Sequence, residues 1–377
     1  MGDIYGNAYL VISATLAKNG DQGLYQERSP FQIEVTTQDG QTVKAQVFEK
    51  SHHDIWKKGE ECWEAPKLPL FGRAWAFQER LLARRVIHYT PTELVWECWS
   101  HIECECGDLQ KPQTSWPEFG GGKNLKTEYG EIARWGADNA RIKFWHVICA
   151  QYSARQLTYA TDRLPALASI AKRMHEQELL GNYLAGIWER TLPTGLFWWS
   201  DTTRLTTSSS ENATHWRDKT HNIPTWSWLS IEGRVCTWGK IHTSLIDIRN
   251  MSYTVGSNDQ YGPCEQGMIT VVGHCVPIKL VDARRPDGSS NKKVLLPGTE
   301  DIVDFTADEN PFEYSEEDLS KSHLLALRFG GRKEHMYSQV MILKLVFGKS
   351  NMYERLGIAE CPHWWFGGQA KRIVELV

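Results

Sequence analysis

The chain has 377 residues, enough for two domains or one large one, and 41% of them are hydrophobic, so it can bury a substantial core. Lys and Arg number 42 against 46 Asp and Glu, a formal net charge of −4 with neither sign in a long block. This balance disfavours a dedicated nucleic-acid or membrane-surface binder, which usually presents a basic patch. The N-terminus lacks the features of a signal peptide, and no window reaches the roughly 18 apolar residues of a membrane span. We therefore expect a cytoplasmic protein.

Two residue types stand out in the composition. Nine cysteines are an odd count, so at least one thiol is unpaired within a monomer, and in a reducing cytosol we expect most to be buried, inert thiols. The 17 tryptophans make the chain tryptophan-rich, and several occur in close pairs, such as Trp198/Trp199 and Trp226/Trp228. We interpret the pairs as aromatic packing in which one ring is buried. A carbohydrate-binding or base-stacking surface is the alternative.

Apolar periodicity and turn residues predict the elements of the first half of the chain. In chain order they are a buried strand at 4–14, a hairpin at 31–48 turning near Asp39-Gly40, a helix at 72–83, short strands at 86–89 and 94–96, a loop at 114–125, a long amphipathic helix through Ile132, Trp135, Ile142, Trp145, Cys149 and Tyr152, and a second helix at 163–178. Because the first strand reads as central, the domain looks cut at its start.

The second half changes to short strands separated by turns. Strands are expected at 269–281, 324–329 and 340–346, and the polar stretch 282–322 is expected to form exposed loops. The fold class is therefore mixed α+β. It comprises a truncated α/β half at 1–113, a helical segment at 126–180 and a mostly β region at 181–377.

Six sequence blocks, in order across nearly the whole chain, resemble the heterokaryon-incompatibility (HET) domain family of filamentous fungi and the region that follows it. The most specific is residues 73–82, Arg-Ala-Trp-Ala-Phe-Gln-Glu-Arg-Leu-Leu, followed by Trp96-Glu97-Cys98. The others are Ile4-Tyr5-Gly6-Asn7-Ala8, Tyr152 to Leu167, Tyr183-Leu184-Ala185-Gly186-Ile187-Trp188, Pro224-Thr225-Trp226-Ser227-Trp228, and the tail from Tyr353 to Gly357 with 371–376.

Two motifs that the family normally carries before the first of these blocks do not occur here. The resemblance therefore implies a HET domain that lacks its N-terminal part. The family's domain has been likened to Toll/interleukin-receptor domains, some of which cleave NAD, but a pocket of that kind would lie largely in the missing part. The sequence therefore assigns no reaction to the protein.

The helix at 72–83 carries the candidate site residues. Trp75 and Glu79 are four residues apart and share a face, and Arg73 and Arg80 supply partners for the carboxylate. As a functional site, the helix would offer Glu79, Arg73 and Arg80 for catalysis and Trp75 and Gln78 for ligand binding. The alternative is a buried Arg-Glu network that pins the helix to the sheet.

Other chemistry finds little support in the sequence. Cys98 to Cys106 is dense in possible ligands, but Cys104 and Cys106 have one residue between them and structural zinc pairs have about two to four. The histidines of His52-His53-Asp54 lie in a polar setting, where a solvated or hydrogen-bonded side chain is far commoner than a metal ligand. Hydrolase and phosphate-loop motifs do not occur. We therefore expect no metal and no cofactor.

The resemblance implies a role in fungal non-self recognition, that is, vegetative incompatibility and regulated cell death, with protein partners or self-association. One alternative is a HET-like scaffold recruited as an enzyme or accessory protein in fungal secondary-metabolite biosynthesis. A deep pocket lined by Trp75 and Glu79 would favour that alternative. A second alternative is a fragment without independent function, which exposed apolar surface beside the strand at 4–14 would favour.

Overall fold

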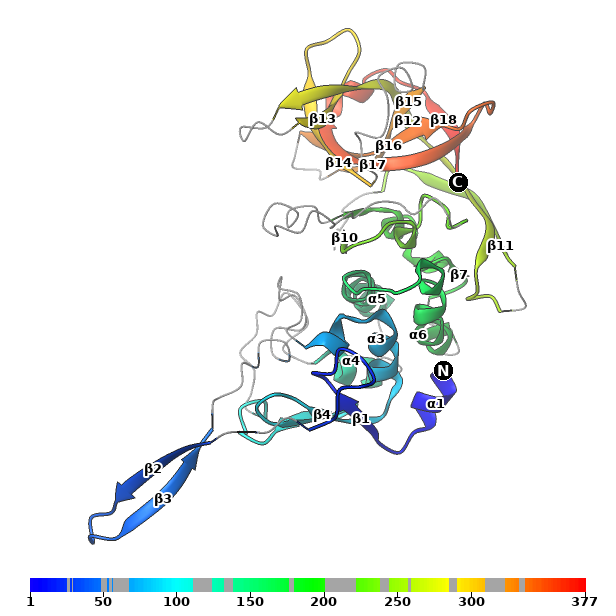
Figure 1. Cartoon of the computed structure of the whole chain (residues 1–377). Helices are drawn as coiled ribbons and strands as arrows, with labels where there is room; N and C mark the ends of the chain where they lie inside the picture. Colours follow the sequence, from blue (N-terminus) through cyan, green and yellow to red (C-terminus); the bar gives the residue numbers. More distant parts are fainter. Residues whose placement is uncertain are drawn as a thin grey trace. The chain divides into compact units, whose positions relative to one another are not determined.

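The computed structural model describes residues 1–25, 28, 30–48, 53, 56, 68–110, 124–131, 138–175, 180–200, 222–237, 244–256, 259–284, 290–308, 323–331 and 336–377. The chain forms two compact units. The first comprises Met1–Gly136 with Arg155–Leu157, and the second comprises Ala137–Ala154 with Thr158–Val377. In Figure 1 the first runs from blue to cyan and the second from green to red. Among the described residues, no helix is both long enough and apolar enough to cross a membrane.

The first unit is built on a four-stranded sheet in the order β1-β4-β5-β6. Its strands are β1 (Val11–Ala14), β4 (Arg85–Tyr89), β5 (Leu94–Cys98) and β6 (Ile102–Cys104). β1 and β4 are parallel, whereas β4, β5 and β6 are antiparallel neighbours. Parallel strands need a crossover connection, and the one between β1 and β4 contains the helix that the sequence predicts at 72–83. This helix is α3 (Ala74–Leu82).

The remaining elements of the first unit are α1 (Gly2–Asn7), the hairpin strands β2 (Phe31–Thr36) and β3 (Thr42–Val47), the short 3-10 helix η1 (Pro69–Gly72) and α4 (Leu125–Glu131). The hairpin is confirmed, and Gly40 takes the positive φ of 81° that its turn requires. The buried strand expected at 4–14 is wrong over its first part, and in the strand that does form, β1, only Ser13 is buried. Residues 2–7 form α1, because an apolar run without clear periodicity does not distinguish a strand from a helix.

The second unit begins with α5 (Asp138–Ser153) and α6 (Pro165–His175), which confirms two predicted helices. Trp145, Cys149 and Tyr152 are buried along α5, as their spacing predicts. Ile132 and Trp135, and the predicted loop at 114–123, lie outside the described residues. The short 3-10 helix η4 (Ala160–Asp162) lies between α5 and α6. After α6 come the two-residue strands β7 (Tyr183–Leu184) and β8 (Ile187–Trp188), the short 3-10 helices η5 (Glu189–Thr191), η6 (Thr194–Leu196) and η8 (Trp228–Ser230), and the strand pair β9 (Trp198–Ser200) and β10 (Val235–Thr237).

The turn between β7 and β8 joins two of the family-like sequence blocks. Ala185 and Gly186 both have positive φ, 42° and 87°, as a two-residue hairpin turn requires. The indole N–H groups of Trp145 and Trp228 donate to the Gly186 carbonyl at 2.9 and 2.8 Å, and the Ser227 hydroxyl donates to the Ala185 carbonyl at 2.5 Å. These tryptophans therefore pack and bond inside the fold, which supports the packing interpretation for this part of the chain.

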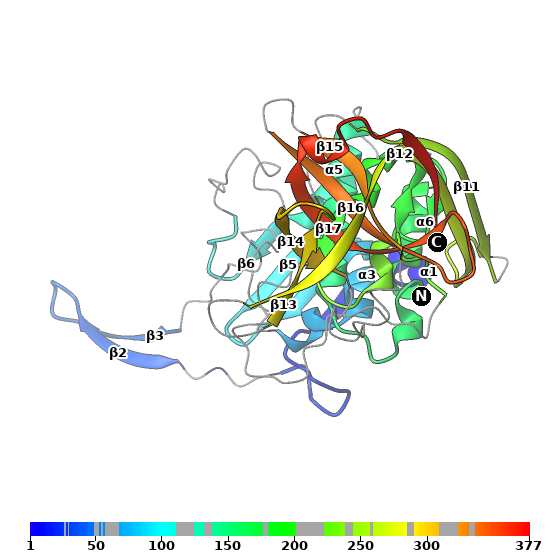
Figure 2. The same ribbon diagram turned by 90° about the horizontal axis from the view of Figure 1, so that it is seen from above.

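The C-terminal part of the second unit forms an antiparallel sheet that closes on itself. The strands pair in the cycle β12-β13-β14-β17-β16-β15, and β15 pairs back with β12. They are β12 (Cys264–Arg284), β13 (Ser290–Leu295), β14 (Ile302–Ala307), β15 (Leu324–Gly331), β16 (Tyr337–Leu345) and β17 (Met352–Pro362). β11 (Asp247–Val255) and β18 (Lys371–Leu376) extend this barrel along β12, and η9 (His363–Phe366) follows β17. Figures 1 and 2 show the ring in yellow to red.

The mostly β region is thus confirmed, but the loops expected at 282–322 are wrong in part. Residues 290–295 and 302–307 form β13 and β14, and Val294 is fully buried in the barrel core. The outward side chains of this hairpin, such as Asp304, are polar and exposed, so the hydrophobicity of the sequence did not indicate two strands here. Residues 285–289 and 309–322 lie outside the described residues.

A buried ion pair fixes β17 to the end of β14. Arg355 and Asp308 are both fully buried, with Nε to Oδ2 at 2.7 Å and Nη2 to Oδ1 at 3.3 Å. The same guanidinium donates to the carbonyls of Leu196 and Trp198 and lies 3.5 Å from the centre of the Trp198 ring. The tail block of the sequence therefore has a structural role at this position.

Candidate functional site

The five candidate residues lie on α3 or at its N-cap, but they face different surroundings. Arg73, the N-cap, is exposed, Trp75 and Glu79 are partly exposed, and Gln78 is buried. The side chain of Arg80 is only 11% exposed. The structure separates the charged residues into two clusters, one around Glu79 and one around Arg80.

Glu79 is paired with the N-terminal helix. The Tyr5 hydroxyl of α1 hydrogen-bonds its carboxyl group, and the charge of Arg73 acts on it. Burial raises the pKa of Glu79, and the bond from Tyr5 and the charge of Arg73 offset this only in part. Burial, together with the Glu79 charge and hydrogen bond, raises the pKa of Tyr5 to about 12. Arg73 thus acts on the carboxylate as expected, but the main partner of Glu79 is Tyr5.

Arg80 binds a different carboxylate. Its Nε donates to Oε2 of Glu97 at 2.8 Å and its Nη2 donates to Oε1 at 2.7 Å, a two-bond geometry that favours Arg over Lys. Glu97 lies on β5 and is fully buried, so this pair ties α3 to the sheet. A buried Arg-Glu network does pin the helix, but its acid is Glu97 and not Glu79.

His88 and Lys126 complete the Arg80 cluster. His88 on β4 is fully buried, and its Nε2 lies 3.1 Å from Oε2 of Glu97. Burial opposes the charge of Glu97, but Arg80, the bond to His88 and Lys126 together hold the pKa of Glu97 well below its ordinary value. Burial lowers the pKa of His88 to about 4. Burial also lowers the pKa of Lys126 to about 8, against the Glu97 charge, which raises it. At neutral pH, Glu97 is therefore ionised and His88 is neutral.

Aromatic rings enclose the guanidinium of Arg80. Its central carbon lies 4.5 Å from the ring centre of Phe71 and 5.0 Å from that of Trp56. The Trp56 ring also lies 5.0 Å from the His88 ring. A desolvated cation between aromatic rings gains both electrostatic and packing energy. The cluster has the features of a structural ion-pair network, which perturbs pKa values as strongly as a catalytic site does.

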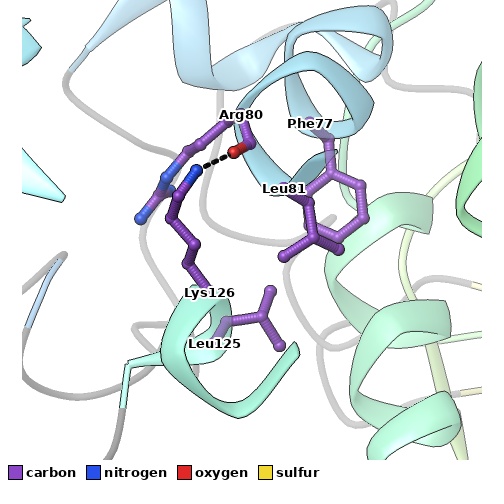
Figure 3. A pocket seen from close by; sticks show the side chains of 5 residues that line it. All are labelled: Phe77, Arg80, Leu81, Leu125 and Lys126. Atoms are coloured by element: carbon purple, nitrogen blue, oxygen red, sulfur yellow. Dashed lines mark hydrogen bonds between the residues drawn. The ribbon is translucent and has the colours of Figure 1, made fainter. Parts of the chain in front are cut away.

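Beside this network is a small hollow, drawn in Figure 3. Five residues line it: Phe77, Arg80, Leu81, Leu125 and Lys126. The Lys126 ammonium donates to the backbone carbonyl of Arg80, the dashed line of the figure, and so joins α4 to α3. The cavity of about 10 Å³ holds at most one water-sized molecule. Trp75 and Glu79 do not line it, so this hollow gives the small-molecule scaffold alternative no support.

Sequence reasoning missed three members of the Arg80 cluster. Glu97 stands inside the quoted Trp96-Glu97-Cys98 block, so a signal was present, but a charged residue in a short strand is usually assigned to the solvent face. His88 occupies a buried position of β4, where alternation would have identified it as inward-facing. Lys126 carries no sequence signal, because its burial depends on contacts distant in the chain.

Among the described residues, four side chains that could hold a metal ion form a separate cluster in the first unit. It consists of His53, Glu93, Cys104 and Cys106, whose ligand atoms all lie within 4.8 Å of one another. His53 was expected to be a solvated or hydrogen-bonded side chain; it is only 4% exposed and is hydrogen-bonded to Glu93. Its neighbours His52 and Asp54 lie outside the described residues.

Comparison with known families identifies the N-terminal segment. Residues 1–79 match the model of the family described as heterokaryon incompatibility protein (HET). The matched segment contains α1, β1, the β2–β3 hairpin and most of α3, and it ends at Glu79. No curated protein and no solved structure shows a significant match to the chain. The match covers the motifs Ile4-Tyr5 and Arg73 to Glu79, so it agrees with the resemblance that these motifs indicate.

Proposed function

We propose that the protein acts in fungal non-self recognition as a HET-domain protein, with a part in vegetative incompatibility and regulated cell death. The observation that carries this proposal is the family match at residues 1–79. The sequence blocks beyond residue 79 resemble the region that follows the domain in this family. They support the same proposal for the rest of the chain.

The geometry of the first unit supports a role in binding or signalling more than one in catalysis. Arg80 and Glu97 are occupied with each other, and Glu79 is engaged by Tyr5. The charged groups of α3 therefore serve to hold α1, α3 and the sheet together. In this proposal the partners are proteins, in keeping with the formal charge of −4.

Induced expression of the full chain in a filamentous fungus tests the proposal. We expect induction to reduce hyphal viability, and we expect Arg80→Ala to abolish the effect because it removes the two-bond ion pair that compensates the buried Glu97 carboxylate. Arg84→Ala is the matched control, since Arg84 follows α3 directly but is exposed. Unchanged viability with the wild-type chain present at a level confirmed by immunoblot contradicts the proposal.

A further inference from the structure

The first unit contains a second buried polar cluster, which has no part in the proposed function. His53 Nε2 lies 2.5 Å from Oε1 of Glu93 and 3.7 Å from Sγ of Cys106. Cys106 Sγ in turn lies 3.5 Å from Sγ of Cys104. The side chains of His53 and Glu93 are 2% and 6% exposed and Cys104 is buried, whereas Cys106 reaches the surface. Two thiols, an imidazole and a carboxylate therefore converge on one point.

The local backbone explains how two cysteines with one residue between them can both face this point. Cys104 ends β6, and the Gly107 N–H donates to the Cys104 carbonyl at 3.1 Å, closing a turn. Gly107 has φ 76°, a left-handed conformation that favours glycine. After this turn the Leu109 N–H points at Sγ of Cys104 at 3.4 Å. The spacing argument against zinc assumes that the ligands come as two pairs close in sequence. Here the fold supplies the other two ligands, His53 and Glu93, from distant parts of the chain.

The contacts around the four side chains are those that orient metal ligands. Nδ1 of His53, the ring nitrogen turned away from the cysteines, lies 3.4 Å from Oδ2 of Asp108. A metal-binding histidine almost always gives its second ring N–H to a carboxylate or carbonyl, which fixes the tautomer and leaves Nε2 free to coordinate. The Cys106 N–H holds Oε2 of Glu93 at 3.0 Å, so the carboxylate is also oriented.

We propose that His53, Glu93, Cys104 and Cys106 bind one structural zinc ion. With Zn–S bonds of about 2.3 Å and Zn–N bonds of about 2.0–2.1 Å, a tetrahedral zinc site places its sulfur and nitrogen ligands roughly 3.5–3.8 Å apart. The Cys104–Cys106 and Cys106–His53 distances of 3.5 and 3.7 Å agree with this geometry. Four protein ligands leave no open position, which is the pattern of a structural site.

The ligand set also selects the metal. Two thiolates with an imidazole suit a borderline-soft ion such as Zn²⁺, and they disfavour Ca²⁺ and Mg²⁺, which prefer oxygen ligands. Binding releases three protons to solvent: the two thiol protons and the proton shared by His53 Nε2 and Glu93. The imidazole then coordinates in its neutral form, with its remaining proton on Nδ1. The 2.5 Å between His53 and Glu93 is a hydrogen-bond distance, so these two groups separate by roughly 1 Å as the ion replaces the shared proton. The ion then links the segment at residue 53 to the turn at 104–109.

Metal analysis of the purified full chain, carrying no polyhistidine tag, tests the proposal. We expect about one zinc ion per chain in the wild type, loss of zinc in Cys106→Ser and in His53→Gln, and retention in Cys98→Ser. Cys98 is the matched control because it is a buried cysteine of the same unit outside the cluster. Zinc retained in both Cys106→Ser and His53→Gln overturns the assignment.

Cobalt titration of the wild-type chain keeps the proposal testable if a variant does not fold. Co²⁺ in place of zinc should give the intense d–d bands of a tetrahedral ion and a thiolate charge-transfer band whose strength corresponds to two sulfur ligands. The proposal is overturned if the wild-type chain retains no zinc after dialysis against a zinc-containing buffer and also shows no such cobalt spectrum. The four side chains then form a hydrogen-bond network only.

Discussion

Arg80 and Glu97 meet in two parallel hydrogen bonds of 2.7 and 2.8 Å, between a helix and a strand, with the carboxylate fully buried. Removing one member of such a pair leaves an uncompensated buried charge, which costs more than the pair itself contributes. The pair therefore contributes to the stability of the first unit, and it joins the arginine of the helix block to the glutamate of the Trp96-Glu97-Cys98 block.

Breaking this pair should destabilise the first unit strongly. We expect Arg80→Met to lower the free energy of unfolding by about 3–5 kcal/mol, and the double variant Arg80→Met/Glu97→Leu to recover most of the loss, because apolar residues of similar volume replace a buried pair at little cost. Urea unfolding measures both. Lys44→Ala, which breaks the exposed pair with Glu34, is the control and should cost about 1 kcal/mol or less. A double variant as unstable as the single one contradicts this account.

The buried histidines should make the protein sensitive to acid. Burial lowers the pKa of His88 to about 4 from an ordinary 6.5, so between these values the unfolded chain binds a proton that the folded chain does not. Stability therefore falls as the pH drops through this window, and loss of the Glu97 charge adds to the fall below its ordinary pKa of 4.5. His146 in the second unit, with its pKa also lowered to about 4 by burial, contributes in the same direction.

Thermal unfolding measured against pH separates the two histidines. His88→Gln should flatten the acid dependence of the first unit's transition and leave that of the second unit unchanged. His146→Gln should do the reverse. An acid dependence that neither variant alters would show that other groups carry it.

The Tyr5–Glu79 hydrogen bond should be visible in the titration of Tyr5. Glu79→Gln removes a negative charge, so we expect the pKa of Tyr5 to fall from about 12 toward its ordinary 10 without reaching it, because burial is the larger cause and remains. Phenolate absorbance, taken as the difference from the Tyr5→Phe variant, measures this. If Glu79→Gln keeps its fold yet abolishes the cell-death response, Glu79 is a functional residue and the structural interpretation of this pair is wrong.

The turn at Gly186 should tolerate no side chain. A Cβ there would lie 2.7 Å from Cδ1 of Leu229 and 2.9 Å from Nε1 of Trp228, in addition to the strain of φ 87°. Gly348→Ala is the matched control, since Gly348 has φ 76° and nothing lies within 4 Å of its Cβ position. The control should cost about 1–2 kcal/mol from backbone strain alone. Gly186→Ala should cost clearly more in the second unit's denaturant transition, and equal losses would contradict the packing described for this turn.

Much of the fold was accessible from sequence because periodicity reports which face an element buries. α3, the β2–β3 hairpin, α5 and α6 follow from apolar spacing and from turn residues such as Gly40. α1 and the β13–β14 hairpin were missed for opposite reasons. α1 is an apolar run without a clear period. The β13–β14 hairpin is polar, and it forms because its strands pair with β12 and β17 to close the barrel.

The site was less accessible, because its members come together only through long-range contacts. Helix spacing identifies Trp75, Glu79 and Arg80 as candidate site residues. It does not show that Arg80 forms an ion pair with Glu97 on β5. Likewise, Cys104 and Cys106 are conspicuous in the sequence, whereas His53 lies 51 residues before Cys104 and its burial is a property of the fold. The identity of a side chain indicates which chemistry is possible, and the topology of the fold determines which side chains come together to form a site.

The central claim, the proposed role in fungal non-self recognition, is tested most directly by deleting the gene in its source organism and pairing the deletion strain with strains incompatible with its parent. The account predicts that at least one incompatible pairing becomes compatible, with a stable heterokaryon and no cell death at the contact zone, and that the wild-type gene restores the reaction. If every pairing keeps the outcome of the parent strain, the account is contradicted.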